Sequence, residues 1–113
     1  MSELPVLNAE ELMARLGGSR VALAQLVPVL TQSAATWQAE LKAALAAGDA
    51  VRLGRAAHTA KGSLGTLAAP RAAAAAKAVE DLARAGDLAT APAAVATLLA
   101  ETERAHAAVR DLL

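Results

Sequence analysis

The chain has 113 residues, and its 11 basic and 11 acidic side chains give a formal net charge of zero at pH 7. This length predicts one domain over residues 1–113, and the balanced charge argues against nucleic-acid or membrane-surface binding. There is no cysteine, which excludes disulfides and thiolate metal sites. The chain start lacks a signal-peptide pattern, and no apolar run approaches the roughly 20 residues of a membrane span, so we expect a soluble cytoplasmic protein.

Helix-forming signals run through the whole chain. Alanine, the best helix former, is abundant, leucine and valine recur at helical intervals, and no alternating run indicates a strand. Short connections between the helices should make neighbouring helices antiparallel. We therefore predict an all-α fold, an antiparallel four-helix bundle with a short extra helix at the N-terminus.

The first two predicted helices begin at polar capping residues and end at glycines. Asn8 is expected to cap a short helix over residues 9–16, and Ser19 to cap a long helix over residues 20–47. Pro28 lies inside the long helix and removes one backbone donor. It should either bend this helix or split it.

The remaining three helices are separated by further capping residues and prolines. Asp49 should cap a third helix, residues 50–68, which ends there because Pro70 disfavours helical structure at the residue before it. A proline suits the first turn of a helix, so a fourth helix is predicted over residues 70–85. A last helix then opens at Thr90.

The third predicted helix carries His58 on a face with few side chains. At about 100° per residue, Gly54, Gly62 and Gly65 fall within roughly 40° of the direction of His58. A glycine inside a helix costs about 1 kcal/mol relative to alanine, so three on one stripe suggest that something bulky approaches the histidine. His58 should point to solvent, because the apolar face lies opposite: Leu53, Ala56, Ala57, Ala60, Leu64 and Leu67.

Residues 57–63, Ala-His-Thr-Ala-Lys-Gly-Ser, followed by Leu67 and Ala69, resemble the signature of the histidine-containing phosphotransfer (HPt) domain. In that family, His-x-Leu-Lys-Gly-Ser/Ala precedes a short apolar stretch that ends in Gly-Ala. This chain departs from the pattern twice, with Ala60 where leucine is usual and Ala68 where glycine is usual. Both departures bear on packing and on the helix end rather than on phosphate chemistry.

The resemblance implies that His58 exchanges a phosphoryl group with an aspartate on a receiver domain of a response regulator or a hybrid histidine kinase. In HPt proteins the receiver supplies the divalent cation, so no cofactor is expected on this chain. No P-loop or ATP-binding kinase motif is present, so the chain should be a phosphocarrier without kinase activity of its own. A monomer is expected.

The family also places an acidic or amide side chain on the next helix, where this chain has Glu80. Hairpin geometry supports the match independently: with the turn centred near Ala69, the eleventh residue beyond it lies level with His58. A carboxylate there can accept the Nδ1 hydrogen and leave Nε2 as the nucleophile. Alternatively, Glu80 only pairs with Lys77 and Arg84 on a solvated face.

Five further residues are candidates for contact with the phosphoryl group or with the partner. Lys61 should offset the charge of the phosphoryl group, and a side chain in place of Gly62 would block the reactive nitrogen. Arg55 and Arg84 are candidates for secondary contacts. Val51 lies roughly 20° from His58 on the helix and is the best candidate for an exposed apolar contact.

Other site classes have little support. Two histidines 48 residues apart without cysteine make no metal site, and no Ser-His-Asp grouping has supporting spacing. His106 lies beside an apolar stripe and Trp37 on the long helix, so both are predicted to be structural. Ser63 lies about 140° from His58 and is not expected to contact the phosphoryl group.

Two other functions stay open. The chain could be a helical interaction or scaffold module with an HPt-like fold, in which His58 is dispensable. It could also be the dimerising histidine domain of a sensor kinase. That family usually has Glu or Asp directly after the histidine, whereas this chain has Thr59.

Overall fold

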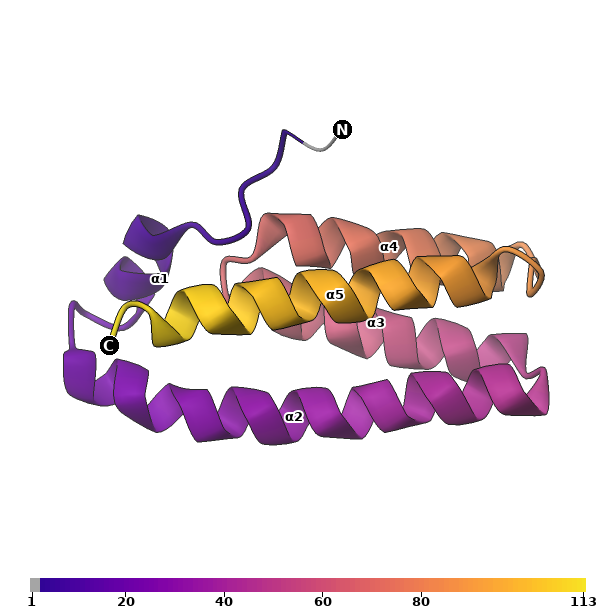
Figure 1. Ribbon diagram of the computed structural model, residues 1–113, viewed down its shortest axis with the longest axis horizontal. Coiled ribbons are helices and arrows are strands. Elements are labelled where there is room, and N and C mark those ends of the chain that lie inside the picture. The colour runs from indigo at the N-terminus through magenta and orange to yellow at the C-terminus, as the bar shows by residue number, and fades with distance from the viewer. Residues whose placement is uncertain (1–2) are drawn as a thin grey trace.

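The computed structural model describes residues 3–113, which form five α-helices and no strand (Figure 1). The all-α prediction is confirmed. Met1 and Ser2 lie outside the described residues. They are the first residues of the predicted domain and of the chain start in which no signal-peptide pattern was found. The helices are α1 (Ala9–Arg15), α2 (Arg20–Ala47), α3 (Ala50–Thr66), α4 (Pro70–Arg84) and α5 (Ala91–Arg110).

The N-termini of the first three helices are capped as predicted. The side chains of Asn8, Ser19 and Asp49 each accept a hydrogen bond of 3.1 Å from the backbone N–H three residues on. The start of α5 differs, because the Thr90 side chain makes no capping bond. Asp87 takes this role, and its Oδ1 accepts the Thr90 N–H at 3.0 Å.

Helix α2 continues through Pro28 as one helix of 28 residues, so the proline does not split it. Pro28 is exposed, with its ring on the solvent side. Leu23 before it and Ala34 after it are both buried. Packing therefore holds both halves of α2 on the same core and offsets the missing backbone donor.

The third helix ends at Thr66, two residues before the predicted end. The cause is Ala68, whose φ of 63° is left-handed. The Ala68 N–H bonds to Gly65 O at 3.1 Å and the Ala69 N–H to Leu64 O at 3.0 Å, the pattern of a Schellman cap. Ala68 is the position at which the family signature has glycine, the residue that adopts this conformation without strain.

The four long helices lie alongside one another, with α1 at the end where α2 begins and α5 ends (Figure 1). Contacts join α2 to α3, α3 to α4, α4 to α5 and α5 back to α2. The core contains fully buried leucines from four helices, among them Leu12, Leu41, Leu53 and Leu98. Trp37 is buried in the same core, as predicted.

The segment before α2 ties down the turn between α3 and α4. The Asn8 N–H bonds to Ala68 O at 2.8 Å, and the Arg71 N–H to Pro5 O at 3.3 Å. Arg15 of α1 donates to two carbonyls at the end of α3, Gly65 O at 2.9 Å and Thr66 O at 2.7 Å. These bonds fix the turn that sets which residues of α3 and α4 lie level with each other.

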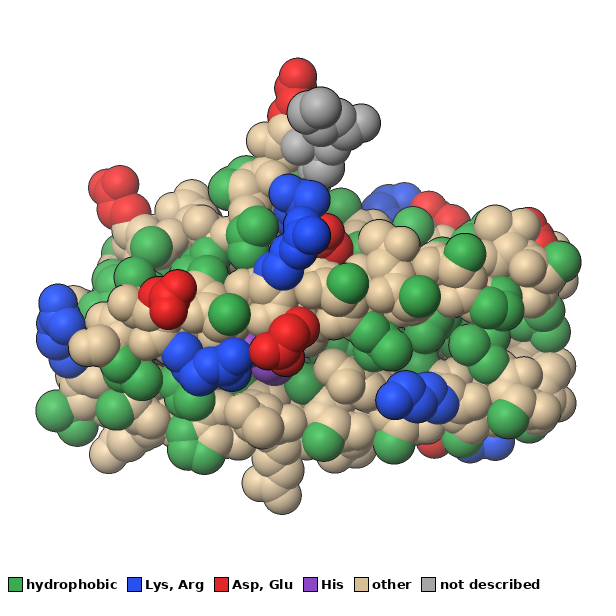
Figure 2. All heavy atoms as spheres, in the orientation of Figure 1, with side chains coloured by type: hydrophobic (Ala, Val, Ile, Leu, Met, Phe, Trp, Pro, Cys, Tyr) green, Lys and Arg blue, Asp and Glu red, His purple; other side chains and the backbone are tan. Residues whose placement is uncertain are grey.

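The surface mixes charges of both signs. On the face shown in Figure 2, basic and acidic side chains are interspersed among apolar ones rather than gathered into a patch of one sign. Within residues 3–113, no helix is both long enough and apolar enough to span a membrane.

Candidate functional site

His58 projects from the outer face of α3. The six residues predicted to form the apolar face of this helix are all buried, and the His58 side chain is 67% exposed. The helix is amphipathic with a narrow, alanine-rich inner face, so it packs closely on its neighbours while the imidazole stays in solvent. The ring is therefore open to a partner, as the helical periodicity predicts.

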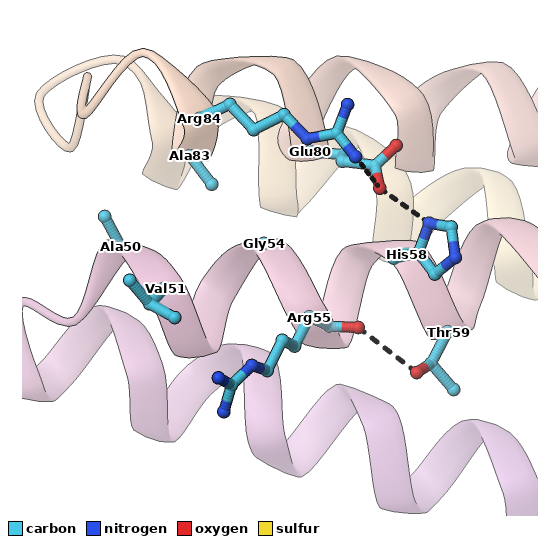
Figure 3. Close-up of a pocket in the computed structure, with 9 residues that line it drawn as sticks. All are labelled: Ala50, Val51, Gly54, Arg55, His58, Thr59, Glu80, Ala83 and Arg84. Atoms are coloured by element: carbon cyan, nitrogen blue, oxygen red, sulfur yellow. Dashed lines mark hydrogen bonds and ion pairs between the residues drawn. The ribbon is translucent and has the colours of Figure 1, made fainter.

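Glu80 reaches His58 from α4 (Figure 3). Its Oε2 lies 2.7 Å from Nδ1 of His58, which confirms the position predicted from the hairpin. The Glu80 side chain is only 3% exposed, although it belongs to the same site as an open histidine. Buried carboxylates require hydrogen-bond partners, and this one lies where α3 and α4 meet.

Three cationic or donor groups surround the Glu80 carboxylate. Lys61 Nζ lies 2.7 Å from Oε1, and a nitrogen of Arg84 lies 3.2 Å from Oε2, the oxygen that also contacts His58. The hydrogen bond from Lys61 and, next, that from His58 hold the pKa of Glu80 below its ordinary value, against the raising effect of burial. Glu80 is therefore ionised near neutral pH.

An ionised carboxylate only accepts hydrogen bonds, so the hydrogen shared with Glu80 must be carried by Nδ1 of His58. In the neutral ring this leaves the lone pair on Nε2, on the exposed side of the imidazole. The site thus presents one oriented nucleophilic nitrogen to solvent.

The alternative pairing of Glu80 is correct only in part. Arg84 does pair with Glu80, whereas Lys77 pairs with Asp81 at 2.9 Å. Lys61, which the sequence places beside an incoming phosphoryl group, is bound to the carboxylate in this structure.

The glycines of α3 leave its outer face bare. A Cβ at Gly62 or Gly65 would meet no atom within 4 Å outside its own helix. At Gly54 a Cβ would lie 3.5 Å from the Cβ of Ala83 on α4, which is ordinary contact. Packing inside the molecule therefore does not require glycine at these three positions.

A hollow of about 570 Å³ opens between α3 and α4 beside the histidine (Figure 3). Val51 stands at its edge and is 64% exposed, in agreement with the sequence prediction. The hollow brings together predicted site residues from two helices, and its lining is Ala50, Val51, Gly54, Arg55, His58, Thr59, Glu80, Ala83 and Arg84.

A protein-family model described as the Hpt domain matches residues 25–108. The chain belongs to the HPt domain family. The match spans all of α3 and α4, and so contains His58, Lys61 and Glu80. HPt domains act in histidine phosphotransfer in phosphorelays and interact with receiver domains. A search of curated proteins and a search of solved structures found no match.

The remaining candidates lie apart from the HPt site. His106 is half-buried on α5, and burial lowers its pKa. Ser63 is half-buried and does not line the hollow. In the described part of the chain, no three or more His, Cys, Asp or Glu side chains are grouped to hold a metal ion.

Sequence reasoning missed three residues that line the hollow, Ala50, Thr59 and Ala83. Counting across the hairpin from Gly54 reaches position 84, so the count finds Arg84 and only the neighbourhood of Ala83. Ala50 and Thr59 gave no such signal, because an alanine or a threonine on a helix has no special chemistry.

Proposed function

We propose that this HPt domain is a phosphocarrier of a two-component phosphorelay, which accepts a phosphoryl group on Nε2 of His58 and returns it to a receiver aspartate. One observation carries the proposal: an exposed imidazole whose Nδ1 is bonded at 2.7 Å to a buried, ionised carboxylate. A histidine with only a structural role needs no such pairing on an exposed helix face.

In the transfer step, the Nε2 lone pair attacks the phosphorus of the aspartyl phosphate. The bond between phosphorus and the aspartate oxygen breaks, and the aspartate leaves as a carboxylate. The ring keeps its Nδ1 hydrogen and gains positive character, which the Glu80 carboxylate stabilises. The reverse step returns the phosphoryl group along the same path. Positioning and charge supply most of the catalysis in such transfers.

Two neighbours of His58 support this chemistry. Lys61 holds Oε1 of Glu80 and places a positive charge one helical turn from the phosphoryl group, which it offsets. Gly62 keeps the approach open. Helical side chains lean toward the N-terminus, so a larger residue at position 62 would cover the histidine.

The partner in this proposal is a receiver domain of a response regulator or of a hybrid histidine kinase, and it carries the divalent cation. The chain works as a monomer in the cytoplasm, with its four long helices forming an antiparallel four-helix bundle. The ring of contacts among α2, α3, α4 and α5 supports that arrangement.

The test uses a panel of receiver domains phosphorylated with radiolabelled acetyl phosphate and mixed with the purified chain. We expect acid-labile label on the wild type and none on His58→Gln. The matched control is His106→Gln, which changes the second histidine and should be labelled like the wild type. Label that persists in His58→Gln places the acceptor elsewhere. No label on the wild type leaves the scaffold alternative.

A second variant tests close approach. Gly62→Leu should keep the helical circular dichroism of the wild type, because a Cβ there meets open space. It should nevertheless slow transfer severely, since the new side chain covers Nε2. Transfer at the wild-type rate would show that no partner approaches along this part of α3.

A further inference from the structure

The hollow beside His58 lies on one side of the imidazole. Its lining on α3 comes from residues 50–59, which lie before His58 or directly after it. Gly62 and Gly65 continue the bare face on the other side but do not line the hollow. The two sides of the histidine therefore differ in shape: the hollow between α3 and α4 lies only on the side toward the start of α3.

The floor of the hollow is apolar and close to the backbone. Gly54 faces Ala83 across it, at the distance where a Cβ would just touch, and Ala50 and Val51 complete its apolar part. Val51 is 64% exposed. An apolar side chain from a partner would bury this valine and fill space left by the glycine, which is a favourable exchange.

Two arginines stand on opposite sides of this floor (Figure 3). Arg84 lies along α4, is 70% exposed and bonds to Glu80, a carboxylate it shares with two other groups. Arg55 extends from α3 away from α4 and is exposed, and no ion pair or side-chain hydrogen bond of Arg55 is found in the described part of the chain. Glu40, in the neighbouring hollow that Arg55 also lines, is already paired with Arg52 at 2.8 Å.

We propose that the receiver domain docks by placing an apolar side chain, flanked by carboxylates, into the hollow on the Gly54 side of His58. This inference rests on the proposed function and specifies the partner surface that the HPt domain recognises. The apolar contact contributes affinity, and pairing of the carboxylates with Arg55 and Arg84 contributes orientation and association rate. His58 and Lys61 continue to hold Glu80 during docking.

Two exposed valines test the apolar contact. Val51 lines the hollow and is 64% exposed, whereas Val29 on α2 is 61% exposed and lies outside it. The probe is the unphosphorylated form of the receiver that labels the wild type best. Val51→Asp should raise its Kd about tenfold or more, and Val29→Asp less than about twofold. Both substitutions are on exposed helix positions, and circular dichroism checks that both variants are folded.

Two exposed basic side chains test the proposed ion pairs with the partner in the same way. Arg55→Glu should raise the Kd about fivefold or more and weaken its dependence on salt, because it replaces an attractive charge at the interface with a repulsive one. Lys42→Glu changes the same charge at an exposed site on α2 outside the hollow, and should leave the Kd within about twofold of the wild type.

The outcomes separate the two proposals. If the wild type is labelled on His58 but Val51→Asp and Arg55→Glu bind like their controls, the docking surface is wrong and the phosphocarrier function stands. If no receiver labels the wild type, the function fails and the docking inference fails with it.

Discussion

Glu80 connects three groups of the site through one buried carboxylate. It accepts from His58 and Arg84 on one oxygen and from Lys61 on the other. The full set of contacts needs the ionised form, because a protonated carboxyl would donate from one oxygen where both oxygens must accept. The orientation of the His58 ring therefore depends on the charge of a side chain that is only 3% exposed.

The pH dependence of stability should show that the folded protein favours the ionised form of Glu80. The pKa of Glu80 is lowered in the folded state, chiefly by the hydrogen bond from Lys61, so the unfolded chain takes up the proton first as the pH falls. The stabilisation is complete above the ordinary value of 4.5 and is lost as the pH falls through the lowered one. Between pH 6 and pH 3, the thermal midpoint of the wild type should fall more than that of Glu80→Gln.

The control for this experiment is Asp81→Asn, which removes a carboxylate from an exposed ion pair with Lys77. Exposed pairs contribute little, so this variant should follow the wild type. Parallel pH curves for the wild type and Glu80→Gln would show that Glu80 is not stabilised as an anion in the folded protein.

Two alanine-to-glycine substitutions, Ala68→Gly and Ala57→Gly, should change the free energy of unfolding in opposite directions. Ala68→Gly removes about 1–2 kcal/mol of left-handed strain and loses about 0.8 kcal/mol of methyl burial, so the variant should be up to about 1 kcal/mol more stable. Ala57 is buried inside α3, and Ala57→Gly should cost about 1–2 kcal/mol. Urea unfolding measures both. Destabilisation by Ala68→Gly of the same size as by Ala57→Gly would contradict the strain at this turn.

The sequence predicts the position of Lys61 on its helix but not its ion pair. A helical wheel places it near His58, and the structure agrees. The wheel cannot show that its ammonium group pairs with Glu80, because that partner belongs to another helix. Only the register of α3 against α4, fixed by the turn between them, brings the two together.

Among the helices, local sequence signals predict where a helix begins better than whether a proline interrupts it. The caps at Asn8, Ser19 and Asp49 were readable because a short polar side chain before an apolar run satisfies backbone donors at once. The effect of Pro28 could not be read in this way. Whether α2 splits there depends on how strongly the residues on either side are held in the core, which is a property of the fold.

The contact of α1 with the end of α3 leads to the next prediction. Arg15 donates to Gly65 O and Thr66 O, carbonyls in the last turn of α3, and its charge suits a helix C-terminus. Arg15→Ala should cost about 1 kcal/mol of stability, measured by urea unfolding. Lys77→Ala, which breaks an exposed pair within one helix, should cost only about 0.3 kcal/mol. Equal losses would show that α1 does not stabilise the end of α3.

At the scale of the whole molecule, the site is a product of the α3–α4 hairpin. Counting residues from the turn was enough to place Glu80 opposite His58. The one-sided hollow was not predicted, because the bare face of α3 has glycines on both sides of the histidine. The difference comes from α4: Ala83 faces Gly54 as a second wall at 3.5 Å from a Cβ there, whereas a Cβ at Gly62 or Gly65 would meet nothing within 4 Å outside its own helix. A pattern within one helix holds no information about that.

The proposed location of the divalent cation on the receiver gives a last prediction, on metal removal. If the divalent cation belongs to the receiver, EDTA should stop transfer from the phosphorylated receiver to His58. It should leave the thermal midpoint of the isolated chain unchanged, since residues 3–113 contain no cluster of metal-ligating side chains. Sedimentation of the chain should give a monomer of 11.3 kDa with and without EDTA. A midpoint that falls on chelation would place a stabilising metal on this chain, and a dimer would favour the sensor-kinase alternative.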